Sequence, residues 1–261
     1  MASAKMKKLT PQVYLGSIRI DNLSFSMAIK AIEKLIILNA NSYVVTPNVD
    51  HIVKLQKDED FKKIYNQANL VLADGMPLIW ASHFLKCPLI ERITGSDLFP
   101  HLCEISAVKG YKIFLLGGRD GAAEGAKQNL EKKYPGIRIV DTYCPYFGFE
   151  SDIHENQKIV ERIKAASPDL LFVGLGAPKG EKWIYRYKDL YQAPVSLSVG
   201  VSIEFLAGMV KRAPVWMQKG GLEWAWRLMM EPQKLWKRYL VDDLAFFKLI
   251  LKEKLIRDKE S

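Results

Sequence analysis

A carboxylate and a glycine stand together where a short apolar segment ends. Asp74 and Gly75 directly follow Leu70–Ala73, a run of residues that is typical of a buried strand. A carboxylate in this place is a candidate general base, and the glycine lets a ligand approach the backbone. Asp-Gly is also a common turn sequence, so the pair by itself leaves an ordinary turn open.

Two other polar groups follow or precede expected elements. Thr46-Pro47-Asn48 comes directly after an expected strand, so proline fixes the turn and Asn48 can cap the next helix. Arg92 is a candidate clamp for a phosphate or a carboxylate, with Ser96 or Asp97 as the cap of the helix that follows. A capped turn and a solvated arginine are the structural alternatives.

Glycine-rich turns follow two further expected strands. Gly117 and Gly118 end one of them, and Gly174–Gly176 with Pro178 end the other. Backbone N–H groups and the helix dipole at such turns can hold a phosphate. The first turn does not match G-x-G-x-x-G, so it is weak evidence for a dinucleotide. Two glycine-lined strand exits in one sheet favour an extended phosphorylated ligand.

The elements that must position these groups alternate between short β-branched runs and longer amphipathic segments. We expect strands near 43–46, 70–73, 111–116, 137–140, 170–173 and 195–199. Helices are expected near 24–38, 58–66, 97–109, 122–134, 152–166 and 179–190. This order predicts an α/β fold with a Rossmann-like parallel sheet and helices on both faces. Ligands bind such sheets beyond the carboxyl ends of the strands.

Composition narrows the class of protein. The chain has 261 residues, a formal charge of +9 and three cysteines without metal-ligand spacing. These values favour anionic partners and a reducing compartment, and they predict neither a structural metal nor a disulfide. The first residues lack the apolar stretch of a signal peptide, and no segment reaches the roughly 20 apolar residues that span a bilayer. Any membrane contact is therefore expected to be peripheral.

The C-terminal part of the sequence mixes aromatic rings with cations. Four of the six tryptophans lie between Trp216 and Trp236, interleaved with lysine and arginine. After Pro232, an amphipathic helix is expected, with an apolar stripe formed by Trp236, Leu240, Phe247 and Leu251 and broadened by Phe246 and Ile250. Such a helix either packs on its own core or meets an apolar, anionic surface. We therefore expect a core domain over 1–205 and a helical, membrane-associating appendage over 206–261.

Taken in order, these motifs resemble those of the WecG/TagA/CpsF family, glycosyltransferase family 26. The resemblance is carried by Thr46-Pro-Asn48, Ala73-Asp-Gly75, Glu91-Arg-Ile-Thr-Gly95, Gly174-Leu-Gly-Ala-Pro-Lys179, Phe205-Leu-Ala-Gly208 and Lys211-Arg-Ala-Pro214. It implies a bacterial, inverting, metal-independent enzyme that needs no cofactor. Such an enzyme moves a sugar from a UDP-sugar to a polyprenyl-diphosphate-linked saccharide at the cytoplasmic face of the membrane. It is also compatible with self-association.

The resemblance also implies roles for single residues. Asp74 is the expected catalytic base, with Thr46 beside it, and Asn48 and Arg92 are expected to orient the sugar, the acceptor or a phosphate. The departing UDP needs cationic stabilisation without a metal. For that role the candidates are the arginines of the appendage, Arg212, Arg227 and Arg238. They are not expected to serve one purpose, since some can face anionic lipid while others fold over the UDP diphosphate.

Two departures from the family pattern concern the donor. Gly180 stands before Glu181 where the family commonly has glutamine, and Glu204 replaces an aspartate. N-acetylmannosamine, its uronic acid and another hexose or uronic acid therefore all remain open as the transferred sugar. The four histidines, including His51, lack mutual metal spacing and are expected to be structural.

Two other classes of protein are alternatives to an enzyme that transfers sugar. The basic charge would suit a nucleic-acid-binding protein, but no helix-turn-helix, zinc-finger or RNP-like motif occurs in the sequence, so no nucleic acid is expected. A nucleotide-cofactor dehydrogenase would rest on the Gly117-Gly118 turn alone, without the full fingerprint and its acidic partner.

Overall fold

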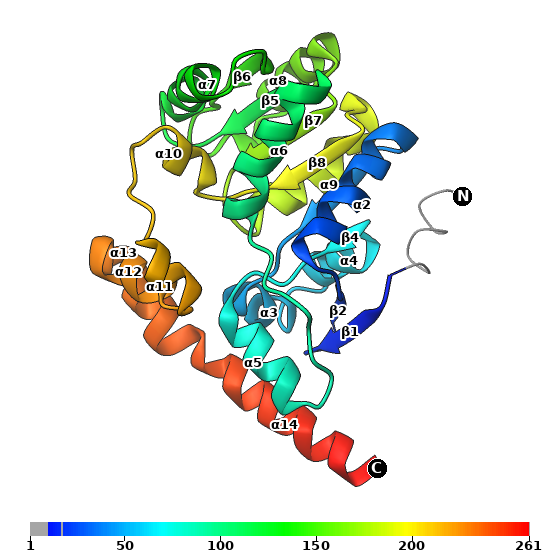
Figure 1. Cartoon of the computed structure of the whole chain (residues 1–261), viewed down its shortest axis with the longest axis vertical. Helices are drawn as coiled ribbons and strands as arrows, with labels where there is room; N and C mark the ends of the chain where they lie inside the picture. The colour runs from blue at the N-terminus through cyan, green and yellow to red at the C-terminus, as the bar shows by residue number, and fades with distance from the viewer. Residues whose placement is uncertain (1–9, 17, 261) are drawn as a thin grey trace.

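A parallel sheet forms the centre of the molecule. The computed structural model describes residues 10–16 and 18–260, so residues 1–9 of the expected core domain lie outside it. Six parallel strands pair in the order β4-β3-β8-β7-β5-β6 (Figure 1). Their bounds are β3 Ser42–Val45, β4 Leu70–Val71, β5 Lys112–Gly117, β6 Arg138–Tyr143, β7 Leu170–Gly174 and β8 Val195–Ser198. The expected α/β fold with a parallel sheet is confirmed.

Helices cover both faces of this sheet, as expected. Side chains of each strand alternate between two cores, so Phe114 and Leu116 belong to one cluster and Ile113 and Leu115 to the other. On the first face lie α3 Val49–Leu55, α4 Glu59–Gln67, α5 Met76–Phe84, α8 Ile153–Ala166 and α9 Lys179–Tyr191. On the second lie α2 Phe25–Leu38, α6 Gly95–Lys109, α7 Ala122–Lys133 and α10 Ser202–Leu206. A short 3-10 turn, η1, spans Phe149–Ser151.

The sequence patterns did not predict the first two strands. β1 Gln12–Leu15 and β2 Ile18–Asp21 form an antiparallel hairpin beside the main sheet. Asp21 fastens it, because its Oδ2 accepts a hydrogen bond of 2.9 Å from the backbone N–H of Val71 in β4. Leu15 and Ile20 bury their side chains in the first core.

Helix α6 begins earlier than its expected start. Thr94, and not Ser96 or Asp97, is its cap: Thr94 Oγ1 accepts from the backbone N–H of Asp97 at 3.0 Å. Thr94 Oγ1 also lies 2.8 Å from Asp97 Oδ2. Asp97 therefore lies in the first turn of the helix, where a carboxylate favours the positive end of the helix dipole.

A chain of helices follows α10 and lies beyond one end of the sheet (Figure 1). It consists of α11 Val215–Lys219, α12 Glu223–Met230, α13 Pro232–Lys237, the π-helical turn η2 Arg238–Asp242 and α14 Leu244–Glu260. We call residues 206–260 the tail. None of the described helices is long and apolar enough to cross a bilayer.

The apolar stripe expected after Pro232 is divided between two environments. Phe246 and Ile250 of α14 are buried in the first core. Phe247 and Leu251, on the same helix, are 57% and 55% exposed. Helix α14 thus packs on its own core with one side and leaves an apolar side open. The interpretation of a helix packed on its own core holds for one face, and contact of the other face with a membrane stays a prediction.

The far end of α14 is tied to the first hairpin. Glu253 Oε2 accepts a hydrogen bond of 2.9 Å from the backbone N–H of Gly16. Arg257 Nη2 donates to the carbonyl of Tyr14 at 2.8 Å, and it also pairs with Glu253. These contacts hold the end of the tail against the hairpin, and the buried Phe246 and Ile250 hold the start of α14 against the core.

The buried side of α14 should contribute to the stability of the whole domain. Phe246→Ala removes a ring that is 1% exposed, and we expect it to lower the free energy of unfolding by about 3–5 kcal/mol. Phe247→Ala, the matched control next to it, should change that free energy by less than about 0.5 kcal/mol. Urea unfolding followed by circular dichroism measures both. Equal losses for the two variants would contradict the division described above.

Candidate active site

A large cavity lies at the carboxyl ends of four neighbouring strands. It has a volume of about 1070 Å³. Its floor is built from residues at the ends of β3, β5, β7 and β8: Thr46, Gly118, Gly174, Gly176, Ser198, Val199 and Gly200. We call it the polar cavity, because carboxylates, lysines and arginines stand around this floor. Its position is the one that parallel sheets generally offer to a ligand.

Asp74 lies where the ends of β3 and β4 meet. Its backbone N–H donates to the carbonyl of Pro47 at 2.8 Å, which places the turns after the two strands side by side. Its side chain lines the polar cavity, and Oδ2 accepts a long hydrogen bond of 3.4 Å from the N–H of Gly95.

The pKa of Asp74 is raised to about 7. Burial is the main cause, and the neighbouring carboxylate of Glu223 adds to it, while Arg92 acts in the opposite direction. A carboxylate whose pKa lies near neutrality is suited to accept and release a proton under physiological conditions.

Thr46 and Asn48 stand beside Asp74, as the sequence predicted. Thr46 is buried and lines the polar cavity. Asn48 caps α3, because its Oδ1 accepts from the N–H of His51 at 3.3 Å. The same Oδ1 accepts from Arg238 Nη2 of the tail at 3.3 Å. Asn48 therefore uses the same side-chain oxygen to cap α3 and to bind the tail arginine Arg238.

The glycines of the two turns have different roles, because some line the cavity and one allows close packing of the backbone. Gly176 lines the cavity, where its φ of +73° requires glycine although a Cβ would meet nothing within 4 Å. Gly118 also lines the cavity, but Gly117 does not. A Cβ on Gly117 would lie 2.9 Å from the carbonyl oxygen of Gly174, so this glycine lets two strand exits pack together.

Three residues that were expected near the donor line the polar cavity: Pro178, Glu181 and Glu204. Burial raises the pKa of Glu181, and a hydrogen bond with Ser198 acts in the opposite direction. A Cβ on Gly180 would come within 2.9 Å of Ser198 Oγ. A larger residue at 180 would therefore displace the Ser198 hydroxyl that contacts Glu181.

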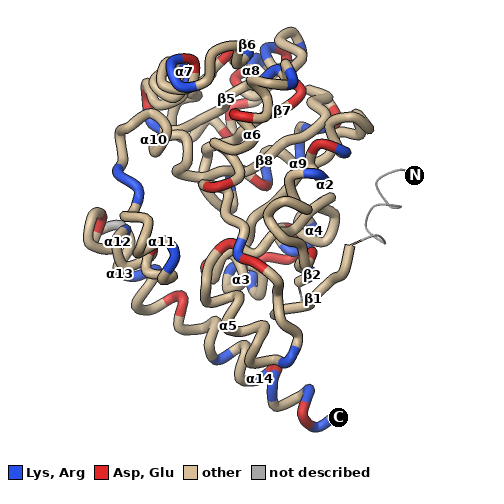
Figure 2. The backbone as a smooth tube through the Cα atoms, viewed as in Figure 1, with Lys and Arg blue, Asp and Glu red and all other residues tan. Residues whose placement is uncertain are grey.

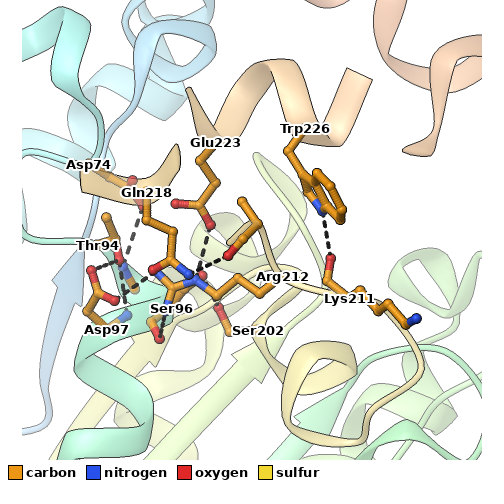
Figure 3. A network of polar contacts seen from close by, with 12 residues as sticks. Asp74, Thr94, Ser96, Asp97, Ser202, Lys211, Arg212, Gln218, Glu223 and Trp226 are labelled. Atoms are coloured by element: carbon orange, nitrogen blue, oxygen red, sulfur yellow. Dashed lines mark hydrogen bonds and ion pairs between the residues drawn. The ribbon is translucent and has the colours of Figure 1, made fainter. Parts of the chain in front are cut away.

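A network of charges ties the tail to the start of α6 (Figure 3). Arg212 Nη2 lies 2.7 Å from Asp97 Oδ1, and its Nε donates to Glu223 Oε1 at 3.1 Å. Arg212 Nη1 also donates to the backbone carbonyl of Ser96 at 3.2 Å. Arg92 faces the same two carboxylates, at 3.6 Å from Asp97 and 3.5 Å from Glu223. We call these four side chains the tail clamp.

The three tail arginines do not share one place. Arg227 and Arg238 line the polar cavity, whereas Arg212 lies outside its lining. Arg238 also lies 3.7 Å from Asp50 Oδ2, so it reaches from the tail to α3. Two of the three candidate arginines therefore line the cavity. The third, Arg212, instead pairs with Asp97 and Glu223 and holds the tail in place.

A second cavity of about 430 Å³ opens on the other side of Asp74. It shares Asn48, Asp74, Ser96, Val201, Arg227 and Arg238 with the polar cavity. Gly75 and Arg92 line this second cavity only. Most of its other walls come from apolar side chains of α5 and the tail, so we call it the apolar cavity. Asp74 thus stands where a polar and an apolar space meet.

Sequence reasoning missed several polar residues of the cavity. Asp50 and Lys54, one turn apart on α3, form an ion pair of 2.8 Å at its wall. Lys179 pairs with Glu150 at 2.5 Å at another wall. The position of Asp50, two residues after Asn48, was a usable signal, because the first turn of a helix that follows a strand exit faces the same crevice.

His51 was expected to be structural, and it also lines the polar cavity. Its Nδ1 lies 2.9 Å from the hydroxyl of Tyr65. Burial lowers its pKa to about 3, so the ring is neutral at physiological pH. Within residues 10–16 and 18–260, no group of three or more histidine, cysteine, aspartate or glutamate side chains is arranged to hold a metal ion.

Comparisons with known proteins identify the family of this chain. Two similar proteins of Staphylococcus aureus, from strains MW2 and NCTC 8325 / PS 47, are 36% and 35% identical over 198 residues, which is 76% of this chain and 74% of each relative. Both bear the name N-acetylglucosaminyldiphosphoundecaprenol N-acetyl-beta-D-mannosaminyltransferase. The model of the glycosyl transferase WecG/TagA/CpsF family matches residues 13–260. With nearly its whole length matched, this chain belongs to the glycosyl transferase WecG/TagA/CpsF family.

Proposed function

We propose that this protein transfers an N-acetylmannosaminyl group from a UDP-sugar to a polyprenyl-diphosphate-linked N-acetylglucosamine. The observation that carries the proposal is Asp74, which stands between a polar and an apolar cavity with its pKa raised to about 7. The names of the two relatives support the choice of sugar and acceptor. Such a product belongs to the synthesis of a bacterial cell-surface polysaccharide.

The proposed chemistry is a single displacement with inversion. A hydroxyl oxygen of the acceptor attacks the anomeric carbon of the donor while Asp74 accepts the hydroxyl proton. The bond between that carbon and the diphosphate oxygen breaks, and UDP leaves with the electron pair. One base suffices, and Thr46 and Asn48 lie close enough to orient the reacting groups.

The leaving diphosphate gains negative charge, which the tail can balance. Arg227 and Arg238 both line the polar cavity beside Asp74. Guanidinium groups bind phosphate oxygens in a bidentate way, so they can replace a metal ion in this role. The N–H of Gly118 donates to the carbonyl of Gly174 at 2.9 Å. The turn at Gly176 also lines the polar cavity, where its backbone can meet the rest of the nucleotide.

A surface for the membrane completes the proposal. The tail exposes large apolar side chains, including Trp216, Trp236, Leu240, Leu251 and Leu255. Lysines and arginines occur along the same segments, which suits an interface with anionic headgroups (Figure 2). We propose that the protein lies peripherally on the cytoplasmic face of the membrane, with this exposed surface of the tail against the lipid headgroups.

The proposal is tested by supplying a lipid-diphosphate-linked N-acetylglucosamine with a panel of UDP-sugars. The panel contains UDP-N-acetylmannosamine, its uronic acid and UDP-hexoses, and mass spectrometry identifies the product. We expect an added mass of one N-acetylhexosamine from UDP-N-acetylmannosamine. Transfer of a uronic acid would correct the donor, and no transfer from any donor would remove the proposed reaction.

Removing the base should abolish transfer without unfolding the protein. Asp74→Asn keeps the shape of the side chain but cannot accept the proton, so we expect kcat to fall by about 10²–10⁴-fold. Asp189→Asn, the same change at an exposed position on α9, serves as the control. Steady-state kinetics measures both, with circular dichroism as the check on folding. An Asp74→Asn variant with full activity would rule out Asp74 as the base.

The raised pKa of Asp74 predicts two pH profiles. Activity requires the ionised form, so kcat/KM should rise with an apparent pKa near 7 and level off above it. The free energy of unfolding changes in the opposite direction. The pKa of Asp74 in the folded state exceeds the ordinary value of 3.8, so the stabilisation that proton binding gives the folded state is lost as pH rises through about 7. Asp74→Asn should therefore gain stability relative to wild type between pH 4 and 8, measured by urea unfolding.

The tail arginines should separate by function. Arg238→Ala and Arg227→Ala should each lower kcat by about 10²-fold or more, because they remove charge stabilisation from the leaving group. Lys237→Ala, at an exposed neighbouring position, should leave kcat unchanged. Arg212→Ala should instead lower the melting temperature, because it leaves Asp97 and Glu223 without their 2.7 Å and 3.1 Å partner. Equal kinetic defects without any loss of stability would contradict this division.

A further inference from the structure

The apolar cavity has a distinct wall on each side. Helix α5 supplies Met76, Pro77 and Trp80, and α5 carries no lysine, arginine, aspartate or glutamate (Figure 2). The tail supplies the facing wall with Trp224, Leu240, Leu244 and Phe247. Four of these side chains remain about half exposed, namely Trp80, Leu240, Leu244 and Phe247. The walls therefore continue outward into an open apolar surface.

The inner end of the same cavity is charged. Three arginines and three carboxylates line it, namely Arg92, Arg227, Arg238, Asp74, Glu223 and Asp243, and Asp74, Arg227 and Arg238 also line the polar cavity. A ligand with an anionic group beside Arg227 and Arg238 and apolar atoms between α5 and the tail would match both parts of this cavity. An entirely apolar ligand would desolvate these charged groups without adding a hydrogen bond, which is unfavourable.

One kind of molecule has its parts in this order. In the acceptor proposed above, the reacting sugar is followed by a diphosphate and then by a branched hydrocarbon chain. Arg227 and Arg238 line both cavities, so they lie between the donor diphosphate proposed for the polar cavity and a ligand in the apolar cavity. If the sugar hydroxyl meets Asp74, the acceptor diphosphate reaches these arginines from the apolar side, and the first hydrocarbon units lie between α5 and the tail. The outer wall then leads along Phe84 of α5 and Leu251 of α14, both exposed, toward the proposed membrane side.

We propose that the apolar cavity binds the first isoprene units of the acceptor's polyprenyl chain. The inference rests on the proposed function and adds to it, because the chain becomes part of what the enzyme recognises and not only an anchor in the bilayer. Trp80 and Phe247 are the residues that hold it, each contacting the chain from one wall. Burial of about 0.8 kcal/mol per CH₂ group makes even two isoprene units a large contribution to binding.

The test uses two acceptors in solution without any membrane. Both carry the same sugar diphosphate, one ending in a methyl group and the other in a ten-carbon chain of two isoprene units. For the wild-type protein we expect kcat/KM to be about tenfold or more higher for the prenyl acceptor. Equal values for the two acceptors would overturn the proposal, whereas absence of transfer to either would instead remove the proposed function.

Matched variants locate the effect. Trp80→Ala and Phe247→Ala should each lose most of the prenyl preference, so that for each variant the ratio of kcat/KM between the prenyl and the methyl acceptor falls toward one. Trp216→Ala and Leu251→Ala remove side chains that are 66% and 55% exposed but do not line the cavity, and they should keep the preference. If all four variants lose it equally, the tail acts only as a general apolar surface and the proposal fails.

Two further readouts exclude other occupants. Sedimentation to vesicles of anionic phospholipid should weaken to the same extent in Phe247→Ala and Leu251→Ala, because both are on the exposed side of α14. Analytical ultracentrifugation should show the same oligomeric state for wild type and Phe247→Ala. If Phe247→Ala changes the oligomeric state and leaves the prenyl preference intact, a second copy of the chain fills the cavity and the proposal is wrong.

Discussion

The attachment of the tail to the start of α6 is the interaction on which the rest of the site depends. Arg212 bridges Asp97 and Glu223, and Arg92 faces the same two carboxylates from the other side. Two cations and two anions share this space, so no charge is left alone in it. Because Glu223 belongs to the tail and also raises the pKa of Asp74, the same contact that positions the tail tunes the expected base. Attachment and chemistry are therefore coupled.

Local patterns predicted the core well because local forces determine it. The six parallel strands and six of the helices appear close to their expected ranges, since buried strands and amphipathic helices reveal themselves within a dozen residues. The neighbourhood of Thr46, Asn48 and Asp74 was also predictable, because parallel strands bring their carboxyl ends to one edge. The hairpin of β1 and β2 escaped notice because two four-residue strands carry too short an alternation to stand out.

For the tail, the sequence predicted the overall character of the surface but not the roles of its single residues. Its rings and cations predicted an apolar, basic surface, yet nothing local distinguishes Arg212 from Arg227 and Arg238. That distinction arises from partners far away in the chain, such as Asp97 and Asn48. The same holds for Phe246 and Phe247, adjacent in sequence, of which one is buried and the other exposed. Long-range packing decides such cases, and the sequence shows only that both faces are apolar.

The burial of Phe246 and Ile250 also has a consequence for the order in which the protein matures. These side chains complete a core whose other members, from Val13 to Ala193, are synthesised before them. Until α14 has emerged, the nascent sheet keeps an uncovered apolar area next to α3. A newly made chain therefore exposes an apolar surface on which other chains can associate. Packing of the last helix against the core covers that surface.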